Sequence, residues 1–169
     1  EKPTGLAFVA HGLGGFKEQK HIQAFAQAFT ENNFTTITWD AADSIGESGG
    51  RMEDATVTSY LEDLQDVIAW AKTQKWYQEP FALCGHSLGA MACTLYAEKN
   101  PQKVKLLAPI STVVSGELAR QTISEKDLNE WKKKGFTLEE SKSKPGVVKK
   151  IGFKLFEDKM QYDLLKNAD

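Results

Sequence analysis

Residues 81–89 read FALCGHSLG, a short apolar run that passes without a linker into a Gly-x-Ser-x-Gly pattern. The run Phe81–Cys84 predicts a buried strand, and the apolar positions that follow Ser87 predict a helix. Glycines at 85 and 89 remove the side chains that would collide where the strand turns sharply into the helix. Such a turn holds a serine hydroxyl beyond the end of the sheet, at the positive end of a helix dipole. The pattern therefore predicts that Ser87 is a nucleophile; the alternative is that Gly85 and Gly89 only permit close packing.

The same alternation of strand and helix extends to both sides of this turn. Apolar and β-branched runs predict strands at 6–10, 34–39 and 104–110, and apolar positions at helical spacing predict helices at 20–31, 57–71 and 88–96. Residues 40–54 are rich in Asp, Ser and Gly, which is typical of an irregular loop. Four strands that alternate with helices predict an α/β fold, with a parallel sheet flanked by helices on both faces.

A second glycine-rich turn, HGLGG at residues 11–15, follows the first predicted strand. In a hydrolase, the backbone N–H groups of Leu13 and Leu88 would form an oxyanion hole, the pair of donors that binds the negative charge of the transition state. A dinucleotide-binding fingerprint that began at Gly12 would need Gly or Ala at position 17, where Lys17 stands, and no Walker sequence is present. A plain glycine turn is the remaining alternative.

These motifs, HGLGG and GHSLG, and the spacing between them resemble the α/β-hydrolase superfamily. The loop of residues 40–57, with GESGGR at 46–51, and the run LLAP at 106–109 resemble bacterial carboxylesterases of the cinnamoyl/feruloyl-esterase type. One departure is Asp43-Ser44-Ile45, where that family often has Gly-His-Gly. The resemblance implies a serine carboxylester hydrolase with the α/β-hydrolase fold.

The alternation of strands and helices ends at Ser111. Residues 117–169 are rich in lysine, contain no run that predicts a strand, and favour short helices around 125–134 and 155–166. Esterases of this type insert a lid after the sixth strand of their sheet. The resemblance therefore implies an α/β-hydrolase core over residues 1–111 and a mostly helical lid over 112–169. The sheet would be truncated before its last strands, so we expect the chain to be a fragment of a longer protein.

A serine nucleophile of this type needs a histidine base and a carboxylate behind it, and no later part of the sequence matches the motifs that carry them. His11 belongs to the oxyanion-loop motif, His86 precedes the nucleophile, and His21 lies near the start of a helix, where we expect it to be exposed. We expect none of the three histidines to lie within hydrogen-bonding reach of the Ser87 hydroxyl. The triad His and Asp would then lie outside this sequence.

Three acidic residues near these motifs have more ordinary interpretations. Glu117 follows the fourth predicted strand, where some lipases place their triad acid, but a solvated surface side chain is favoured. Asp40 and Asp43 are typical of residues that cap a loop by hydrogen bonding to its backbone.

Composition and charge limit the kinds of partner and cofactor that we expect. The net charge of −2 gives no reason to expect nucleic acid or an anionic membrane as a partner, and no apolar run reaches the length of a membrane span. The lysines at 132–134 and 149–150 alternate with acids, as on a solvated surface. Cys84 and Cys93 lack metal-ligand spacing and are expected to be buried free thiols. We expect a cytoplasmic protein without a metal or organic cofactor.

The sequence thus predicts hydrolysis of a small-molecule carboxylic ester through an acyl-enzyme on Ser87, with oxyanion donors at Leu13 and Leu88. The residues expected to support these motifs are His11, Gly12, Gly85, His86 and Gly89. A homodimer through an exposed sheet edge or through the lid is compatible with this prediction. Open alternatives are a thioesterase, an acyltransferase or a serine peptidase of the same superfamily, or a truncated fragment without activity.

Overall fold

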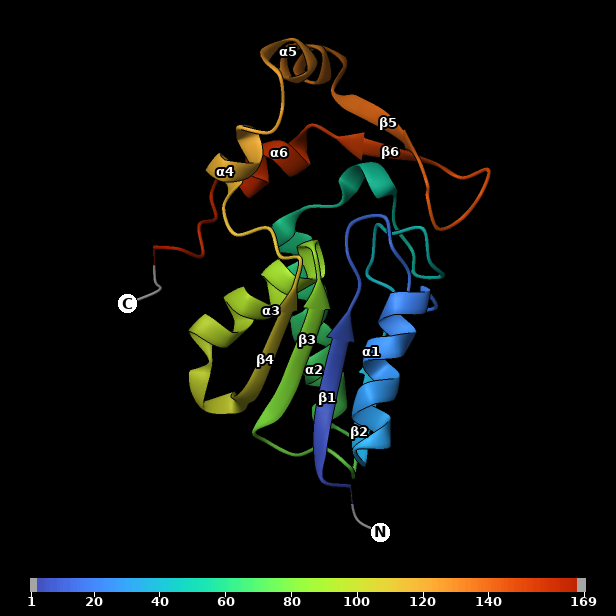
Figure 1. Cartoon of the computed structure of the whole chain (residues 1–169), viewed down its shortest axis with the longest axis vertical. Coiled ribbons are helices and arrows are strands. Elements are labelled where there is room, and N and C mark those ends of the chain that lie inside the picture. Colours follow the sequence, from blue (N-terminus) through green and yellow to red (C-terminus); the bar gives the residue numbers. More distant parts are fainter. Residues whose placement is uncertain (1–2, 167–169) are drawn as a thin grey trace.

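The four predicted strands form one parallel sheet in the computed structural model, which describes residues 3–166 (Figure 1). The strands are β1 (Gly5–Ala10), β2 (Phe34–Thr38), β3 (Phe81–His86) and β4 (Val104–Ile110), in the order β2-β1-β3-β4. The inner strands β1 and β3 are almost entirely buried, because both faces of the sheet are covered there. All neighbours are parallel, so the turns that follow β1 and β3 meet at the same edge.

Helices cover both faces of this sheet, as the sequence predicted. They are α1 (Lys20–Glu31), α2 (Val57–Lys72) and α3 (Leu88–Lys99), with short 3-10 turns at η1 (Met52–Asp54) and η2 (Pro101–Lys103). Alternate side chains of β1 belong to different apolar clusters: Phe8 packs in the cluster of α2 and α3, whereas Val9 packs with Ile22 of α1. The predicted α/β arrangement of residues 5–110 is therefore confirmed.

The segment predicted to be a mostly helical lid, residues 112–169, is called the lid below and differs from the prediction in two respects. It contains a β-hairpin, and its last helix is shorter. Its elements are α4 (Gly116–Arg120), α5 (Glu125–Lys134), β5 (Phe136–Glu140), β6 (Val148–Gly152) and α6 (Lys154–Lys159), and β5 pairs with β6 antiparallel. The expectation of no strand after residue 117 was wrong. Charged residues hid the strand pattern in the sequence, and two of them form an ion pair with each other across the two strands. Glu139 lies opposite Lys149, and their charged groups are 3.0 Å apart. The predicted helix around 155–166 is also shorter, ending at Lys159.

Aromatic packing holds the lid elements to one another. The Trp131 ring on α5 contacts the rings of Phe153 and Phe156 edge-on, and its Nε1–H donates to the backbone oxygen of Ile151 at 3.0 Å. Figure 1 shows the hairpin and α6 above the end of the sheet where the strands terminate. The lid therefore lies over the edge at which Ser87 is expected.

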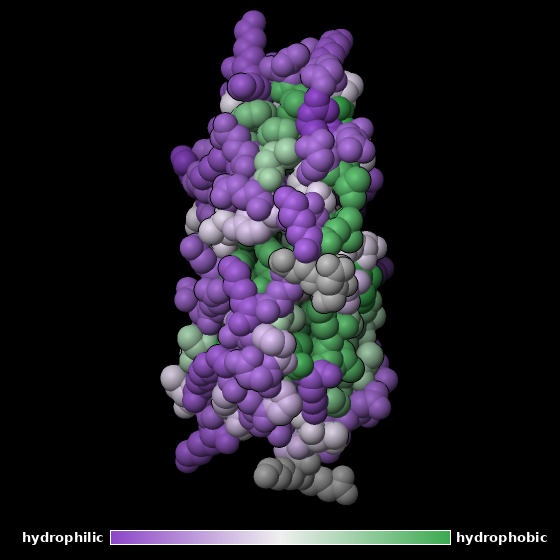
Figure 2. All heavy atoms as spheres, turned by 90° about the vertical axis from the view of Figure 1, so that its left-hand side faces the viewer, coloured by the Kyte–Doolittle hydropathy of each residue, from purple (hydrophilic) through white to green (hydrophobic). Residues whose placement is uncertain are grey.

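The strand β4 lies at an edge of the sheet and is only partly covered. Leu106 is 44% exposed, and Figure 2 shows hydrophobic residues at the surface on the side of the molecule where α3 and β4 lie. Both cysteines are buried free thiols, as predicted. Within residues 3–166, no helix combines the length and the apolar character that crossing a bilayer requires.

Candidate active site

The backbone at Ser87 has the strained geometry that the sequence motif predicts. Ser87 separates β3 from α3 and has φ 52° and ψ −114°, a region that residues with a side chain rarely adopt. The turn is closed by contacts that only glycine allows. A Cβ atom on Gly85 would lie 2.6 Å from the nitrogen of Ala90, and one on Gly89 would lie 2.3 Å from the oxygen of His11. Both glycines are therefore required for the position of Ser87.

The loop after β1 packs directly against this turn. A Cβ atom on Gly12 would lie 3.1 Å from the Cβ of Ser87 and 3.1 Å from the backbone oxygen of His86. Gly12 thus lets the peptide that carries the Leu13 N–H approach the serine. Leu88 is the first residue of α3, so its N–H has no partner within the helix. The structure thus brings together the two turns that the sequence singled out: Gly12, which precedes Leu13, lies against Ser87, which precedes Leu88.

His11 supports the loop and has no nitrogen free for catalysis. The side chain is buried, its Nε2 accepts the N–H of Ala41 at 3.0 Å, and its Nδ1–H donates to the oxygen of Gly12 at 2.8 Å. Burial lowers the pKa of His11, although the Gly12 bond and the charge of Asp40 oppose this. A neutral imidazole with both nitrogens bonded fixes the start of residues 11–15, the predicted oxyanion loop.

The rings of the other two histidines contact each other. The rings of His21 and His86 meet edge-on with centroids 4.7 Å apart, and burial lowers the pKa of His86. The expectation that His21 is exposed was wrong: it is half-buried, and its Nε2 is buried without a hydrogen-bond partner within residues 3–166. Packing of α1 over the end of β3 brings the two rings together. Across the described part of the chain, no histidine forms a hydrogen bond with the Ser87 hydroxyl.

The acidic residues near the site stabilise loops. Asp40 accepts hydrogen bonds from the backbone N–H of Lys17 at 2.7 Å, from its ammonium at 2.7 Å and from the N–H of Glu47 at 3.0 Å. Burial raises the pKa of Asp40, but these bonds outweigh it and hold the pKa below its ordinary value. Asp43 accepts from the N–H of Arg51 at 2.7 Å, so both aspartates cap the loop as predicted. Glu117 is exposed on α4.

Three carboxylates close to this loop do not form a metal site. The side-chain oxygens of Glu18, Asp40 and Glu47 lie within 4.8 Å of one another. The ammonium of Lys17 occupies the position of a cation, because it lies 2.9 Å, 2.7 Å and 2.7 Å from the three carboxylates. The cluster ties the loop after β1 to the loop after β2.

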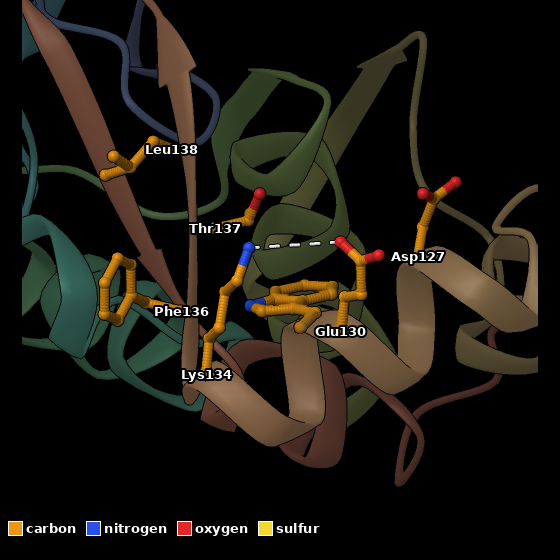
Figure 3. A pocket seen from close by; sticks show the side chains of 7 residues that line it. Asp127, Glu130, Lys134, Phe136, Thr137 and Leu138 are labelled. Carbon is orange, nitrogen blue, oxygen red and sulfur yellow. Dashed lines mark ion pairs between the residues drawn. The ribbon is translucent and has the colours of Figure 1, made fainter.

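A cavity of about 300 Å³ connects the oxyanion loop to the lid. Leu13 lines it together with lid residues of which half are apolar; the lid residues are Ile123, Asp127, Trp131, Thr137, Glu139, Ile151, Leu155 and Lys159. A second cavity of about 380 Å³ lies between α5 and β5 and is more polar at its rim, where Glu130 and Lys134 form an ion pair (Figure 3). Only the first cavity is lined by a residue of the oxyanion loop, so it is the better candidate for a substrate pocket.

Comparisons with known proteins identify the family of the chain and support its fold. The family model described as "Serine aminopeptidase, S33" (Hydrolase_4) matches residues 1–142. A protein of Escherichia coli, described as an uncharacterized 31.7 kDa protein in the traX-finO intergenic region, is 32% identical over 114 residues. That match covers 67% of this chain and 39% of the relative, so the chain corresponds to well under half of that protein.

Two solved structures are similar over nearly the whole chain. Est1E from Butyrivibrio proteoclasticus, with ferulic acid bound, has a TM-score of 0.80 at 20% identity, and the match covers 100% of this chain and 66% of Est1E. The α/β-hydrolase GrgF from Penicillium sp. sh18 has a TM-score of 0.74 at 14% identity, and the match covers 98% of this chain and 67% of GrgF. The likeness extends through the lid, because coverage is nearly complete in both.

Proposed function

The chain belongs to the serine aminopeptidase S33 family of the α/β-hydrolase superfamily, and from this membership we propose that it hydrolyses carboxylic esters through an acyl-enzyme on Ser87. The observation that carries the proposal is the contact between the Ser87 turn and the oxyanion loop. A Cβ on Gly12 would come within 3.1 Å of the Ser87 Cβ, so the Leu13 peptide passes beside the nucleophile.

In the proposed reaction, the Ser87 oxygen attacks the acyl carbonyl and a histidine base takes its proton. The carbonyl oxygen becomes an oxyanion, to which the N–H groups of Leu13 and Leu88 donate. The alcohol leaves with the proton, and water later releases the acid from the serine by the same steps. His11, His21 and His86 make their contacts elsewhere. We therefore propose that the base and its carboxylate are not among residues 3–166.

The lid cavity supports a finer proposal about the substrate. Its apolar lining includes Trp131, Ile151 and Leu155, and it opens beside Leu13, where the acyl carbonyl would lie. A flat aromatic acyl group fits such a lining. Est1E, whose structure contains ferulic acid, has the same arrangement of core and lid by its TM-score of 0.80. We propose a preference for aromatic acyl groups of the cinnamoyl or feruloyl type.

The first test concerns Ser87 in the protein expressed from its whole reading frame. A fluorophosphonate probe should label Ser87, because only an activated serine attacks the phosphorus centre at a useful rate. Intact-protein mass spectrometry should find one adduct on the wild type and none on Ser87→Ala. Ser115→Ala, a change at another buried serine, is the matched control and should be labelled fully. A full-strength adduct on Ser87→Ala would contradict the assignment.

The second test separates the Leu13 amide from its side chain. Leu13→Pro removes the N–H donor and should cost on the order of 100-fold to 1,000-fold in kcat. Leu13→Ala keeps the donor and should retain most of the activity. The measurement is steady-state hydrolysis of p-nitrophenyl esters, with acyl-CoA and aminoacyl amides in the same panel to distinguish thioesterase and peptidase activity. Equal, small effects of both substitutions would make the loop merely structural.

A further inference from the structure

We infer that Tyr60 of α2 is a positioning residue, whose hydroxyl fixes the peptide between Gly12 and Leu13 so that the Leu13 N–H faces the reacting carbonyl. The inference deepens the proposed function and rests on it. Nothing in the sequence motifs pointed to Tyr60, which lies 48 residues after Gly12 and appears in the sequence only as one apolar position of a helix.

The carbonyl group of Gly12 is held by three donors. It accepts from the Tyr60 hydroxyl at 3.1 Å, from His11 Nδ1 at 2.8 Å and from the N–H of Gly15 at 2.9 Å. The peptide that follows is planar and trans, so its N–H points opposite to its C=O. A carbonyl that is bonded into the protein therefore turns the N–H of Leu13 outward. The groups that bind the Gly12 oxygen therefore set the direction of the Leu13 N–H, because both belong to the same peptide.

Tyr60 differs from the other two donors because it comes from outside the loop. His11 and Gly15 are one and three residues from Gly12 and would move with the loop. Tyr60 belongs to α2, whose first turn is fixed by a capping box between Thr56 and Ser59. The Tyr60 side chain is 3% exposed, and its ring meets the His11 ring edge-on at 5.9 Å. The hydroxyl thus anchors the loop to a packed helix.

Burial also keeps Tyr60 in the form that donates. It raises the pKa of the Tyr60 phenol well above its ordinary value, and the charge of Asp63 adds to the effect. The hydroxyl therefore retains its proton over the pH range in which an esterase is assayed. An anionic oxygen could not donate to Gly12, so this protonation state is the one the geometry requires.

The experiment compares Tyr60→Phe with Tyr96→Phe. The first change removes only the hydroxyl that reaches Gly12. The second is the matched control: Tyr96 is a buried tyrosine of α3 that makes no hydrogen bond to the loop within the described residues. NMR of protein labelled with ¹⁵N-leucine should show a lower order parameter for the Leu13 N–H in Tyr60→Phe and no change in Tyr96→Phe. Thermal unfolding of both variants shows that the fold is kept.

Kinetics of the same variants separate positioning from binding. In the protein expressed from its whole reading frame, kcat of Tyr60→Phe should fall by about tenfold, less than for loss of the donor itself, with KM nearly unchanged. Tyr96→Phe should match the wild type. An unchanged Leu13 amide, or an unchanged kcat in an active protein, overturns the inference. A wild type that hydrolyses no ester contradicts the proposed function instead, and the Leu13 measurement still shows whether Tyr60 orients the peptide.

Discussion

The core and the lid are stabilised by different interactions. Buried apolar side chains come almost entirely from β1, β3 and the helices that cover them, whereas the lid contributes few, namely Ile151, Leu155 and Leu164. These three pack in the same apolar cluster as Phe8. Polar contacts also join the lid to the core: Lys150 pairs with Glu53, Lys154 pairs with Asp54, and Asp158 accepts hydrogen bonds from Thr58. The comparison implies that the groups proposed to react are fixed by the core, while the proposed substrate pocket depends on a layer with few buried apolar side chains.

The largest expected effect follows from a deletion in the core. Phe8 is fully buried in the cluster of α2 and α3 and meets the Phe81 ring edge-on at 5.1 Å. Phe8→Ala should lower the free energy of unfolding by about 3–5 kcal/mol, because it removes a large side chain and leaves a cavity. Leu138→Ala in the lid, at a side chain 59% exposed, should change it by less than about 0.5 kcal/mol. Urea unfolding followed by circular dichroism measures both. Similar losses in the two variants would remove the distinction between core and lid.

A smaller effect should result from removing one polar link between core and lid. The Asp158 carboxylate accepts from the N–H of Thr58 at 3.0 Å and from its hydroxyl at 2.5 Å, and so caps the first turn of α2. Asp158→Ala should cost about 1–2 kcal/mol of lid docking. Hydrogen exchange followed by mass spectrometry should then be roughly 5- to 30-fold faster in peptides covering 148–159.

Two controls accompany the Asp158 variant. Glu157→Ala changes an exposed neighbour on the same helix and should leave the exchange of lid peptides unaltered. Asp158→Asn keeps one carbonyl acceptor and should give an intermediate rate. If peptides of β1 and β3 accelerate as much as those of the lid, core and lid unfold as one unit and the comparison fails.

The core could be predicted from sequence because its signals are local. Apolar runs of strand length alternate with segments whose apolar residues have helical spacing. Gly85 and Gly89 indicate the sharp turn at Ser87. The meeting of the two glycine loops then follows, because parallel strands end at the same edge of a sheet, whereas the order of the strands was not predicted. Within the candidate site, such rules predict that the turn at Ser87 and the loop at Gly12 meet; the roles of Ser87, Leu13 and Leu88 stay a prediction.

The remainder could not be predicted because it depends on contacts between distant residues. Tyr60 looks like a core position of α2 until the fold places its hydroxyl at Gly12. His21 appears to lie on an open helix surface until α1 packs its ring against His86. The hairpin of β5 and β6 is concealed by lysines and glutamates whose charges cancel only after pairing. In each case the sequence shows the residue but not its partner.

The smallest expected effect concerns the ion pairs between lid and core, which salt should weaken selectively. Raising ionic strength from 0.1 to 1 M shortens the screening length from about 10 to about 3 Å. The pairs of Lys150 with Glu53 and of Lys154 with Asp54 are open to solvent, whereas the apolar contacts of the core are not weakened by screening. Exchange of peptides covering 148–159 should rise by about twofold or threefold at 1 M NaCl, and peptides of β1 and β3 should not respond.

Lowering the pH should also weaken the ion pairs between lid and core. Hydrogen bonds from Arg51 and Lys154 lower the pKa of Asp54 from 3.8 to about 2, so its stabilising contribution is complete above pH 3.8 and is lost as the pH falls through 2. Lys154→Gln should reduce the response of the lid to salt. Lys126→Gln is the matched control, because Lys126 is exposed on α5 and has no ion pair among residues 3–166. An equal salt response in core and lid peptides would show that these pairs contribute nothing to holding the lid over the site.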